Sequence, residues 1–346
     1  MSAEPLKEAL HRLATGYGLS AAESRAAFDV VMTGEATPVQ VSALLMALRV
    51  KGETAEEVAG AAHALRDAMV RLPCDRPDEL VDTCGTGGGA VQTFNISTGA
   101  ALLAAGAGAR VAKHGNRSFT TQCGSADVLE ALGVPIEVSV EVMEGALREA
   151  GIVFMFAPLM HPAMRHVGPV RRELGIPTVM NIVGPLANPA RAGRQVVGVS
   201  DLERAPILAG ALSALGATHA MVVYGEPGLD EVSPLGPTHV VEVQRGETRR
   251  WTIHPEDHGF KKIARSELAG SEPAENARVI VEILDGKAPK GAVAATVLNA
   301  AAAIFVSGRV QSYEEGVAAA RESIESGRAK NVLERLRRST TKPAKT

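Results

Sequence analysis

Between residues 80 and 224 of this 346-residue chain, short β-rich runs alternate with helical stretches. The strand-like runs are 80–82, 110–112, 152–156, 195–199 and 219–224, and the helical stretches begin at Ser97 and Ser125 or span 139–150 and 202–215. This alternation predicts an α/β fold with a central, mainly parallel sheet flanked by helices on both faces. Residues 238–243 and 249–253 predict a hairpin added to the sheet, and 273–339 predict a return to helices.

Residues 1 to about 72 predict helices only. Three capping boxes indicate helix starts: Ser20–Glu23, Thr37–Gln40 and Thr54–Glu57. Gly34 and Gly52 stand where helices should end. Apolar residues recur at helical spacing between these glycines, at Val39, Leu44, Leu45 and Leu48. A small helical domain is therefore expected, with apolar faces that pack on each other or on a partner chain, followed by a linker at 72–77.

The bulk composition excludes several classes of partner. The chain carries 36 basic and 39 acidic residues, and aromatic residues make up 3% of it, so we expect no nucleic-acid partner. The longest apolar run, 100–109, is interrupted by glycines and is too short to span a membrane. Three distant cysteines favour free thiols in a reducing compartment, and the first residues lack the apolar core of a signal peptide. A cytoplasmic location is expected.

A glycine-rich turn follows the first strand-like run. It contains Gly85, Gly87, Gly88 and Gly89. Glycines let backbone N–H groups approach a ligand closely, and the helix that starts near Ser97 and Thr98 offers free N–H groups and hydroxyls to an anion. The turn matches neither a Walker A pattern nor a dinucleotide fingerprint. Taken alone, it is equally well explained as a plain glycine turn before a capped helix.

A cationic loop follows the next strand-like run and reads Lys113-His114-Gly115-Asn116-Arg117. In a parallel sheet this loop and the glycine turn emerge at the same carboxyl edge, where ligands bind in open α/β sheets. Lys113 supplies a positive charge for phosphate, and Asn116 offers both a donor and an acceptor. His114 alone fits a structural histidine, and Arg117 alone fits a surface ion pair.

Adjacent carboxylates follow the strand-like run 219–224. Asp230 and Glu231 suit a hard divalent ion such as Mg²⁺, which takes one or two carboxylates and leaves its other positions to water and phosphate oxygens. The alternative for this dipeptide is a solvated acidic turn.

Apolar and cationic residues mix between positions 154 and 189. Arg171 in this stretch is suited to pair with the carboxylate of an aromatic acceptor through two parallel hydrogen bonds. Alternatively, the methionines and phenylalanines are core residues, Arg171 pairs within a helix, and His161 before Pro162 ends a strand segment.

Together these motifs resemble the anthranilate phosphoribosyltransferase family. The matching segments are 85–88, 93–98, 113–117, 124–127, 161–164, 169–171, 181–189 and 230–231, in the family's order. The resemblance implies a small helical domain at 1–72, to which part of 165–190 returns, and a large α/β domain at 78–164 and 191–339, followed by a flexible tail at 340–346. It also implies a homodimer through the helical domains.

The resemblance further implies transfer of the 5-phosphoribosyl group of PRPP (5-phosphoribosyl 1-diphosphate) to the amino group of anthranilate, in tryptophan biosynthesis. Carried over by motif, the PRPP-binding residues are Gly85, Gly88, Gly89, Thr93, Asn95, Ile96, Ser97, Thr98, Lys113 and Ser125. Those around anthranilate are Gly85, His114, Asn116, His161, Arg171 and Pro185. Ser97, Asp230 and Glu231 would hold two Mg²⁺ ions, and Lys113 would support the transition state without any side-chain acid or base.

The chain departs from the family pattern at Gly89, where the family usually has aspartate, and around Thr120 to Cys123, where a serine-rich run is common. We expect weaker PRPP binding or an altered Mg²⁺ optimum from Gly89. Two rival functions remain: a pyrimidine nucleoside phosphorylase-like enzyme, and a non-catalytic nucleic-acid-binding relative of the same fold. Retention of Arg171, Asp230 and Glu231 favours the transferase.

Overall fold

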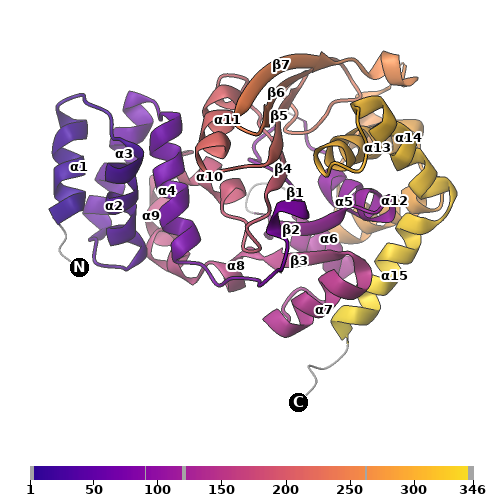
Figure 1. The fold of residues 1–346 in the computed structure, drawn as a ribbon, viewed down its shortest axis with the longest axis horizontal. Helices are drawn as coiled ribbons and strands as arrows, with labels where there is room; N and C mark the ends of the chain where they lie inside the picture. The colour runs from indigo at the N-terminus through magenta and orange to yellow at the C-terminus, as the bar shows by residue number, and fades with distance from the viewer. Residues whose placement is uncertain (1–3, 90, 119–121, 262, 342–346) are drawn as a thin grey trace.

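The computed structural model describes residues 4–89, 91–118, 122–261 and 263–341. Within these ranges one seven-stranded sheet has the order β3-β2-β1-β4-β5-β6-β7 (Figure 1). Its strands are β1 Leu80–Gly85, β2 Arg110–Gly115, β3 Ile152–Phe156, β4 Arg194–Gly198, β5 His219–Gly225, β6 Thr238–Gln244 and β7 Glu247–Ile253. Strands β1 to β5 run parallel, whereas β5–β6 and β6–β7 pair antiparallel. The predicted mainly parallel sheet is confirmed.

The predicted hairpin is the antiparallel pair β6–β7. Arg245 and Gly246 between these strands both have positive φ, 51° and 84°. Two consecutive residues in this conformation form the tight turn whose twist matches that of the flanking strands. The hairpin extends the sheet away from the edge formed by β3.

The N-terminal helices are α1 Glu4–Ala14, α2 Ala21–Met32, α3 Pro38–Lys51 and α4 Ala55–Asp67. All three predicted capping boxes are present, with Ser20, Thr37 and Thr54 accepting bonds from the backbone three residues later. Gly52 caps α3 with a φ of 86°. The side chain of Val39 is 78% exposed, whereas the other three residues of its apolar set are buried within the domain. The apolar surface of α3 is wider than the face that packs inside the domain.

Helices of the large domain flank the sheet. They are α5 Ile96–Gly106, α6 Ser125–Ala131, α7 Val140–Ala150, α11 Arg204–Ala214, α12 Pro273–Leu284, α13 Lys290–Val306, α14 Tyr313–Glu325 and α15 Arg328–Thr341. Thr340 and Thr341, expected in a flexible tail, belong to α15, and 342–346 lie outside the described residues. No helix among the described residues is long and apolar enough to cross a membrane.

The segment between β3 and β4 forms only short helices. They are α8 Ala157–Met160, a 3₁₀ turn at Pro162–His166, α9 Gly168–Leu174, α10 Met180–Val183 and a 3₁₀ turn at Gly184–Leu186. Helix α9 packs against α3, and α10 packs against α4. Figure 1 shows α9 among the N-terminal helices at the end of the molecule distant from α13 and α15.

Two hydrophobic cores meet at the sheet. Val196, Met221 and Val223 face the core that contains α5, α13 and α15. Their neighbours Val197 and Val222 face the second core, which contains α11 and the N-terminal helices. Successive side chains of a strand point to opposite faces, so β4 and β5 contribute to both cores. Helix α4 packs against α11, which links the helical domain to one face of the sheet.

Candidate active site

The glycine turn after β1 is built around the side chain of Asp230. The Gly87 N–H donates a 2.8 Å hydrogen bond to Asp230 Oδ2. A Cβ on Gly85 would overlap the same oxygen, so no larger residue fits there without moving Asp230. Gly87 and Gly88 have φ of 74° and 78°, which L side chains rarely adopt. The turn needs glycine both for close approach and for backbone conformation.

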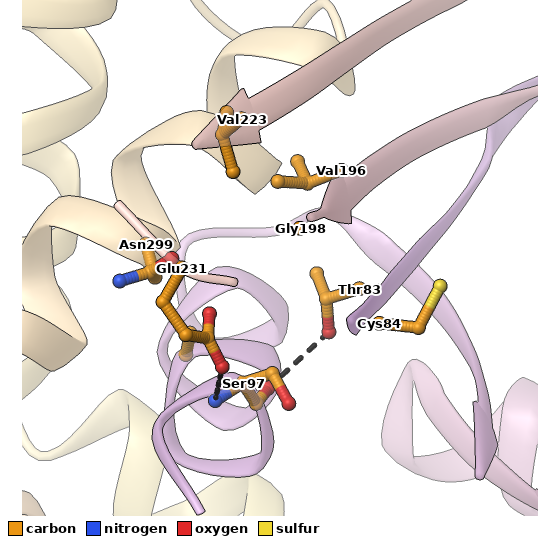
Figure 2. A pocket seen from close by; sticks show the side chains of 9 residues that line it. Thr83, Cys84, Ser97, Val196, Gly198, Val223, Glu231 and Asn299 are labelled. Atoms are coloured by element: carbon orange, nitrogen blue, oxygen red, sulfur yellow. Dashed lines mark hydrogen bonds between the residues drawn. The ribbon is translucent and has the colours of Figure 1, made fainter. Parts of the chain in front are cut away.

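The N-terminus of α5 faces the other carboxylate. The Ser97 N–H donates to Glu231 Oε1 at 3.2 Å. Figure 2 shows the Glu231 carboxylate directed at Ser97 within a narrow pocket that Thr83, Gly198 and Asn299 also line. The first N–H groups of a helix have no intrahelical acceptor and carry the positive end of the helix dipole. This helix end therefore presents an anion site that a protein carboxylate now occupies.

Lys113 reaches the same place from β2. Its side chain is buried, and Nζ donates to Thr83 O at 2.5 Å and to Ser97 Oγ at 3.2 Å. Burial lowers the pKa of Lys113, and the neighbouring Asp82 carboxylate opposes that shift. The predicted meeting of the two loops at one sheet edge thus occurs, with the ammonium group beside the start of α5.

The carboxylates of Asp230 and Glu231 are half-buried and lie next to each other. Burial raises the pKa of both groups, and for Glu231 the adjacent charge of Asp230 raises it further. Neither carboxylate forms an ion pair with a lysine or arginine among the described residues. The Lys113 charge partly opposes the rise in the pKa of Glu231, but two adjacent, partly buried carboxylates without an ion-pair partner among the described residues favour a bound cation.

The donor set fits Mg²⁺. The Glu231 carboxylate contacts the start of α5, where the Ser97 hydroxyl also lies, and the adjacent Asp230 carboxylate contacts the Gly87 amide. These are hard oxygen ligands, and Mg²⁺ completes such a partial set with water and substrate phosphate. No cluster of three or more acidic, histidine or cysteine groups suited to a metal exists in the part of the chain that is described. Asp230, Glu231 and Ser97 thus offer a partial set of oxygen ligands, which phosphate oxygens of a ligand can complete.

Two buried histidines pack against each other close to Lys113. The ring centroids of His114 and His161 are 4.8 Å apart, and the two rings are tilted by 54°. Burial lowers the pKa of His161 to about 4 and holds that of His114 well below its usual range. Both imidazoles are therefore neutral near pH 7, and His114 Nε2 has no hydrogen-bond partner among the described residues.

The remainder of the cationic loop is fixed by α6. The Asp127 carboxylate accepts bonds from the N–H groups of Ser118 and Gly124 and from the Arg117 guanidinium. Arg117 is thus an ion-pairing residue, as its sequence taken alone suggested. Ser125 Oγ donates to Asn116 O at 3.3 Å, and Asn116 Oδ1 accepts the Arg117 N–H at 2.8 Å. Asn116 and Ser125 therefore adjoin each other at the base of the loop.

Arg171 lies on α9, at the side of the helical domain. Burial lowers the pKa of its half-buried guanidinium. No hydrogen bond or ion pair links this group to any other described residue. The Pro185 carbonyl, in the 3₁₀ turn after α10, accepts a 2.9 Å hydrogen bond from Gln195 Nε2. Among the described residues, no hydrogen bond or cation–π contact joins Arg171 to the His114–His161 pair.

The remaining residues predicted to bind PRPP differ in whether their side chains are free to contact a ligand. The Ile96 side chain is 1% exposed and belongs to the core, so it offers only backbone to a ligand. Asn95 is held by Cys123 and Asn276 and forms no side-chain cap on α5. Thr98 is buried, with Oγ1 lacking a hydrogen-bond partner among described residues. Thr93 bridges to Ala269 through its backbone.

Comparisons with known proteins decide the family. Residues 77–330 match the model described as "Glycosyl transferase family, a/b domain", and residues 7–69 match the corresponding helical bundle domain. An anthranilate phosphoribosyltransferase from Anaeromyxobacter sp. (strain K) is 48% identical over 341 residues, covering 98% of this chain and 100% of the relative. This chain belongs to the anthranilate phosphoribosyltransferase family.

Solved structures of anthranilate phosphoribosyltransferases share the fold. The Thermus thermophilus enzyme superposes with a TM-score of 0.91 and 42% identity, covering 96% of this chain and 99% of that one. The Saccharomyces cerevisiae enzyme in complex with PRPP and Mg superposes with a TM-score of 0.87 and 32% identity, covering 98% and 99%. The likeness therefore extends over both domains.

Gly89 departs from the anthranilate phosphoribosyltransferase pattern within a crowded place. A Cβ at this position would lie 3.1 Å from Gly228 O and 3.3 Å from Asp230 Oδ1. An aspartate here would bring a further negative charge beside the Asp230 carboxylate. The glycine therefore relaxes both the space and the charge around Asp230. Residues 119–121, part of the other departure, lie outside the described ranges.

Sequence reasoning missed three buried polar residues that support the site. Asp82 is fully buried, and its carboxylate accepts the His114 N–H and the Asn188 amide. Asn299 of α13 pairs twice with the Val232 backbone, at 2.8 and 2.9 Å, directly after Glu231. For Asp82 and Asn299 the available signal was a polar residue within a largely apolar strand and an alanine-rich helix.

Proposed function

We propose that this chain transfers the 5-phosphoribosyl group of PRPP to the amino group of anthranilate, giving N-(5-phosphoribosyl)anthranilate and diphosphate, in tryptophan biosynthesis. The observation that carries the proposal is the convergence of the Gly87 and Ser97 amides, the Lys113 ammonium and the Asp230–Glu231 carboxylates at one edge of the sheet. Membership of the anthranilate phosphoribosyltransferase family supplies the substrates.

The phosphoribosyl donor binds where those groups meet. Its contacts are Gly85, Gly88, Gly89, Thr93, Asn95, Ile96, Ser97, Thr98, Lys113 and Ser125. Ile96 takes part through its backbone, because its side chain is in the core. The Ser97 amide and the helix dipole of α5 stabilise the phosphate charge. Lys113 adds a cation held in a poorly hydrated place, where its attraction for phosphate is strong.

Two Mg²⁺ ions accompany the donor, with Ser97 holding one and Asp230 with Glu231 holding the other. Bound there, Mg²⁺ would supply charge neutralisation for the departing diphosphate. The yeast relative was solved with PRPP and Mg, which supports use of this metal here. The number of ions is inferred from the two separate sets of oxygen ligands.

Anthranilate occupies a pocket with Arg171 and Asn116 as its polar contacts. Gly85, His114, His161 and Pro185 line the pocket or the route to it. Arg171 is half-buried without an acidic partner among the described residues, which suits a guanidinium that awaits a carboxylate ligand. The two neutral histidines present an uncharged, aromatic wall to the ring.

The reaction needs little acid–base chemistry from side chains. An arylamine is neutral at physiological pH and attacks without prior deprotonation. Both histidines near Lys113 are held neutral by burial, which agrees with a site that positions rather than protonates. Lys113 stabilises the negative charge that grows on the diphosphate oxygen as the ribosyl C1–O bond breaks. Closure of the helical domain, which carries α9, over the sheet edge would exclude water from the activated sugar.

We further propose that the helical domain extends over 1–72 with part of 165–190, and that the large domain extends over 78–164 with 191–339.

We also propose that the chain forms a homodimer through its helical domain. Val39 and Val50 are 78% and 80% exposed on α3, and they lie on one side of that helix together with Ala43. An exposed apolar stripe on a helix is typical of an interface between copies.

The deciding assay mixes purified protein, PRPP, Mg²⁺ and anthranilate and follows the loss of anthranilate fluorescence. Loss that requires all four components supports the proposal. No loss, together with phosphorolysis of thymidine or uridine, would assign the chain to the nucleoside phosphorylases instead. Salt-dependent DNA binding without transferase activity would indicate a nucleic-acid-binding protein.

A further inference from the structure

Each carboxylate at the proposed metal site already accepts a hydrogen bond from an amide of the proposed phosphate site. Asp230 Oδ2 lies 2.8 Å from the Gly87 nitrogen, and Glu231 Oε1 lies 3.2 Å from the Ser97 nitrogen. Lys113 is similarly engaged, through Thr83 O and Ser97 Oγ. These donors, which a diphosphate would use, are therefore satisfied by oxygens of the protein itself.

The surrounding backbone is shaped to hold Asp230 in this position. Gly85 and Gly198 both lie against it, since a Cβ on Gly85 would overlap Asp230 Oδ2 and a Cβ on Gly198 would overlap Asp230 O. On the other side of the pair, Asn299 fixes Val232 through two hydrogen bonds. The carboxylates are therefore set over the amides by packing from both directions.

A metal-free diphosphate meets two obstacles in this arrangement. It must break the hydrogen bonds that Asp230 and Glu231 accept from the amides, and it must approach two acidic side chains. The Lys113 charge offsets part of that repulsion at Glu231, but no lysine or arginine is paired directly with either carboxylate among the described residues. A divalent cation removes both obstacles, because it attracts the carboxylates and neutralises the phosphate.

We infer that Asp230 and Glu231 determine specificity for the metal-bound form of the diphosphate donor, by capping the Gly87 and Ser97 amides until a divalent ion draws the carboxylates away. This inference rests on the proposed function and adds a second role to two proposed metal ligands. A residue that only bound metal would leave metal-free phosphate binding unchanged when removed. A capping residue, when removed, improves metal-free binding and weakens metal-supported binding.

Calorimetry with inorganic pyrophosphate as the probe separates these roles. The proteins are the wild type, Asp230→Ala and Asp230→Asn, each titrated in EDTA and again in excess Mg²⁺. In EDTA, Asp230→Ala should bind pyrophosphate roughly tenfold or more tightly than the wild type, the worth of one charge-assisted hydrogen bond. In Mg²⁺ the order should reverse. Asp230→Asn also removes the charge but keeps an oxygen that accepts from Gly87, so its gain in EDTA should be smaller.

Glu226→Ala is the matched control. Glu226 precedes the pair on the same turn, is half-exposed, and bonds to His239 rather than to a backbone amide. Its removal should leave pyrophosphate binding unchanged in both buffers. Equal gains for Asp230→Ala, Asp230→Asn and Glu226→Ala would show that general charge repulsion accounts for the effect, and would overturn the inference.

A second measurement needs only the wild-type protein. Hydrogen exchange of the peptides containing Gly87 and Ser97 is followed while Mg²⁺ alone is added. Faster exchange at both amides supports the inference, because they lose their acceptors, and unchanged exchange overturns it. Failure of the wild type to bind pyrophosphate even in Mg²⁺ would contradict the proposed function itself. Equal affinities of wild type and Asp230→Ala in EDTA, with binding intact in Mg²⁺, would overturn the capping role alone.

Discussion

Asp82 and Asn188 are joined by a 2.7 Å hydrogen bond, although 106 positions separate them in the chain. The Asn188 amide also donates to Ala112 O, and the second oxygen of Asp82 accepts the His114 N–H. One buried pair therefore ties β1, β2 and the end of the segment that carries Arg171. Because that segment runs from the helical domain back to the sheet, the pair fixes how the proposed anthranilate residues meet the phosphate loops.

The Asp82 pair should make stability depend on pH. Burial raises the pKa of Asp82 to about 6. The folded protein therefore holds a proton at pH values where the unfolded chain has lost it. Its free energy of unfolding should fall as pH rises from about 4 to about 6, by at most about 3 kcal/mol from this group. Asp82→Asn should remove that slope, as measured by urea unfolding at pH 4, 5, 6 and 7. Asp75→Asn, at an exposed position, should keep the wild-type slope, and an unaltered slope in Asp82→Asn would contradict the assignment.

Arg171→Ala should raise the apparent KM for anthranilate roughly ten- to a hundredfold, the worth of a hydrogen-bonded charge pair, with a smaller effect on the KM for PRPP. The physical reason is the half-buried guanidinium without an acidic partner among described residues. Steady-state kinetics with each substrate varied in turn will measure this. Arg172→Ala, its exposed neighbour, is the control and should change neither constant. An unchanged anthranilate KM in Arg171→Ala would show that the assigned pocket is wrong.

Gly89→Asp should shift the dependence of the rate on Mg²⁺ and tighten PRPP binding, because a carboxylate would enter beside Asp230. The Cβ of the new side chain would lie 3.3 Å from Asp230 Oδ1. Rates measured across a Mg²⁺ titration test this, with Gly89→Asn as a control of the same size without the charge. Superimposable curves for wild type and Gly89→Asp would reject a role for this position in metal dependence.

Val39→Lys should weaken the proposed homodimer. The residue is 78% exposed on α3, where a lysine costs the monomer little but places two charges near the axis of a symmetric interface. Light scattering coupled to size-exclusion chromatography should show monomer appearing at lower protein concentration than for the wild type. Glu141→Lys, exposed on α7 of the large domain, should leave the mass unchanged. A wild type that is monomeric at all concentrations would contradict the proposal outright.

Asn299→Ala should weaken Mg²⁺-supported pyrophosphate binding and lower stability. It leaves the buried N–H and C=O of Val232 without their partners, at a cost of roughly 1–3 kcal/mol for each group. The loss frees the segment that carries Glu231. Thermal unfolding and calorimetry in Mg²⁺ will measure both effects. Ser307→Ala removes a hydroxyl near the end of the same helix. It should not weaken Mg²⁺-supported pyrophosphate binding, because it leaves the hydrogen bonds of Val232 in place. Unaltered binding in Asn299→Ala would show that Asn299 does not position Glu231.

Local sequence signals were sufficient to predict the helices and strands and the edge of the sheet where the ligand-binding loops lie. The capping boxes at Ser20, Thr37 and Thr54 form as predicted because both partners lie within one helical turn. The alternation of strands with helices was sufficient to predict a mainly parallel sheet, since parallel neighbours need a crossover. Parallel strands in turn bring the glycine turn and Lys113 to one edge.

The long-range contacts that hold the site residues in place could not be predicted from the sequence. Gly87 meets Asp230 across 143 positions, and Asp82 meets Asn188 across 106. Such pairs depend on strand order and on the register between β1, β4 and β5, which no local pattern encodes. Whether Val39 is covered within the domain was left open for the same reason, because helical spacing identifies an apolar face but not what covers it.

The sequence by itself determined where chain segments become helix, strand or tight turn, because caps, glycines and apolar periods act over a few residues. Only the tertiary structure decided that the acidic pair lies on the amides of the phosphate loops, and that a buried aspartate ties two strands to the returning segment. Those contacts are set by packing of distant segments around a shared core, and packing becomes visible only when the whole chain is folded.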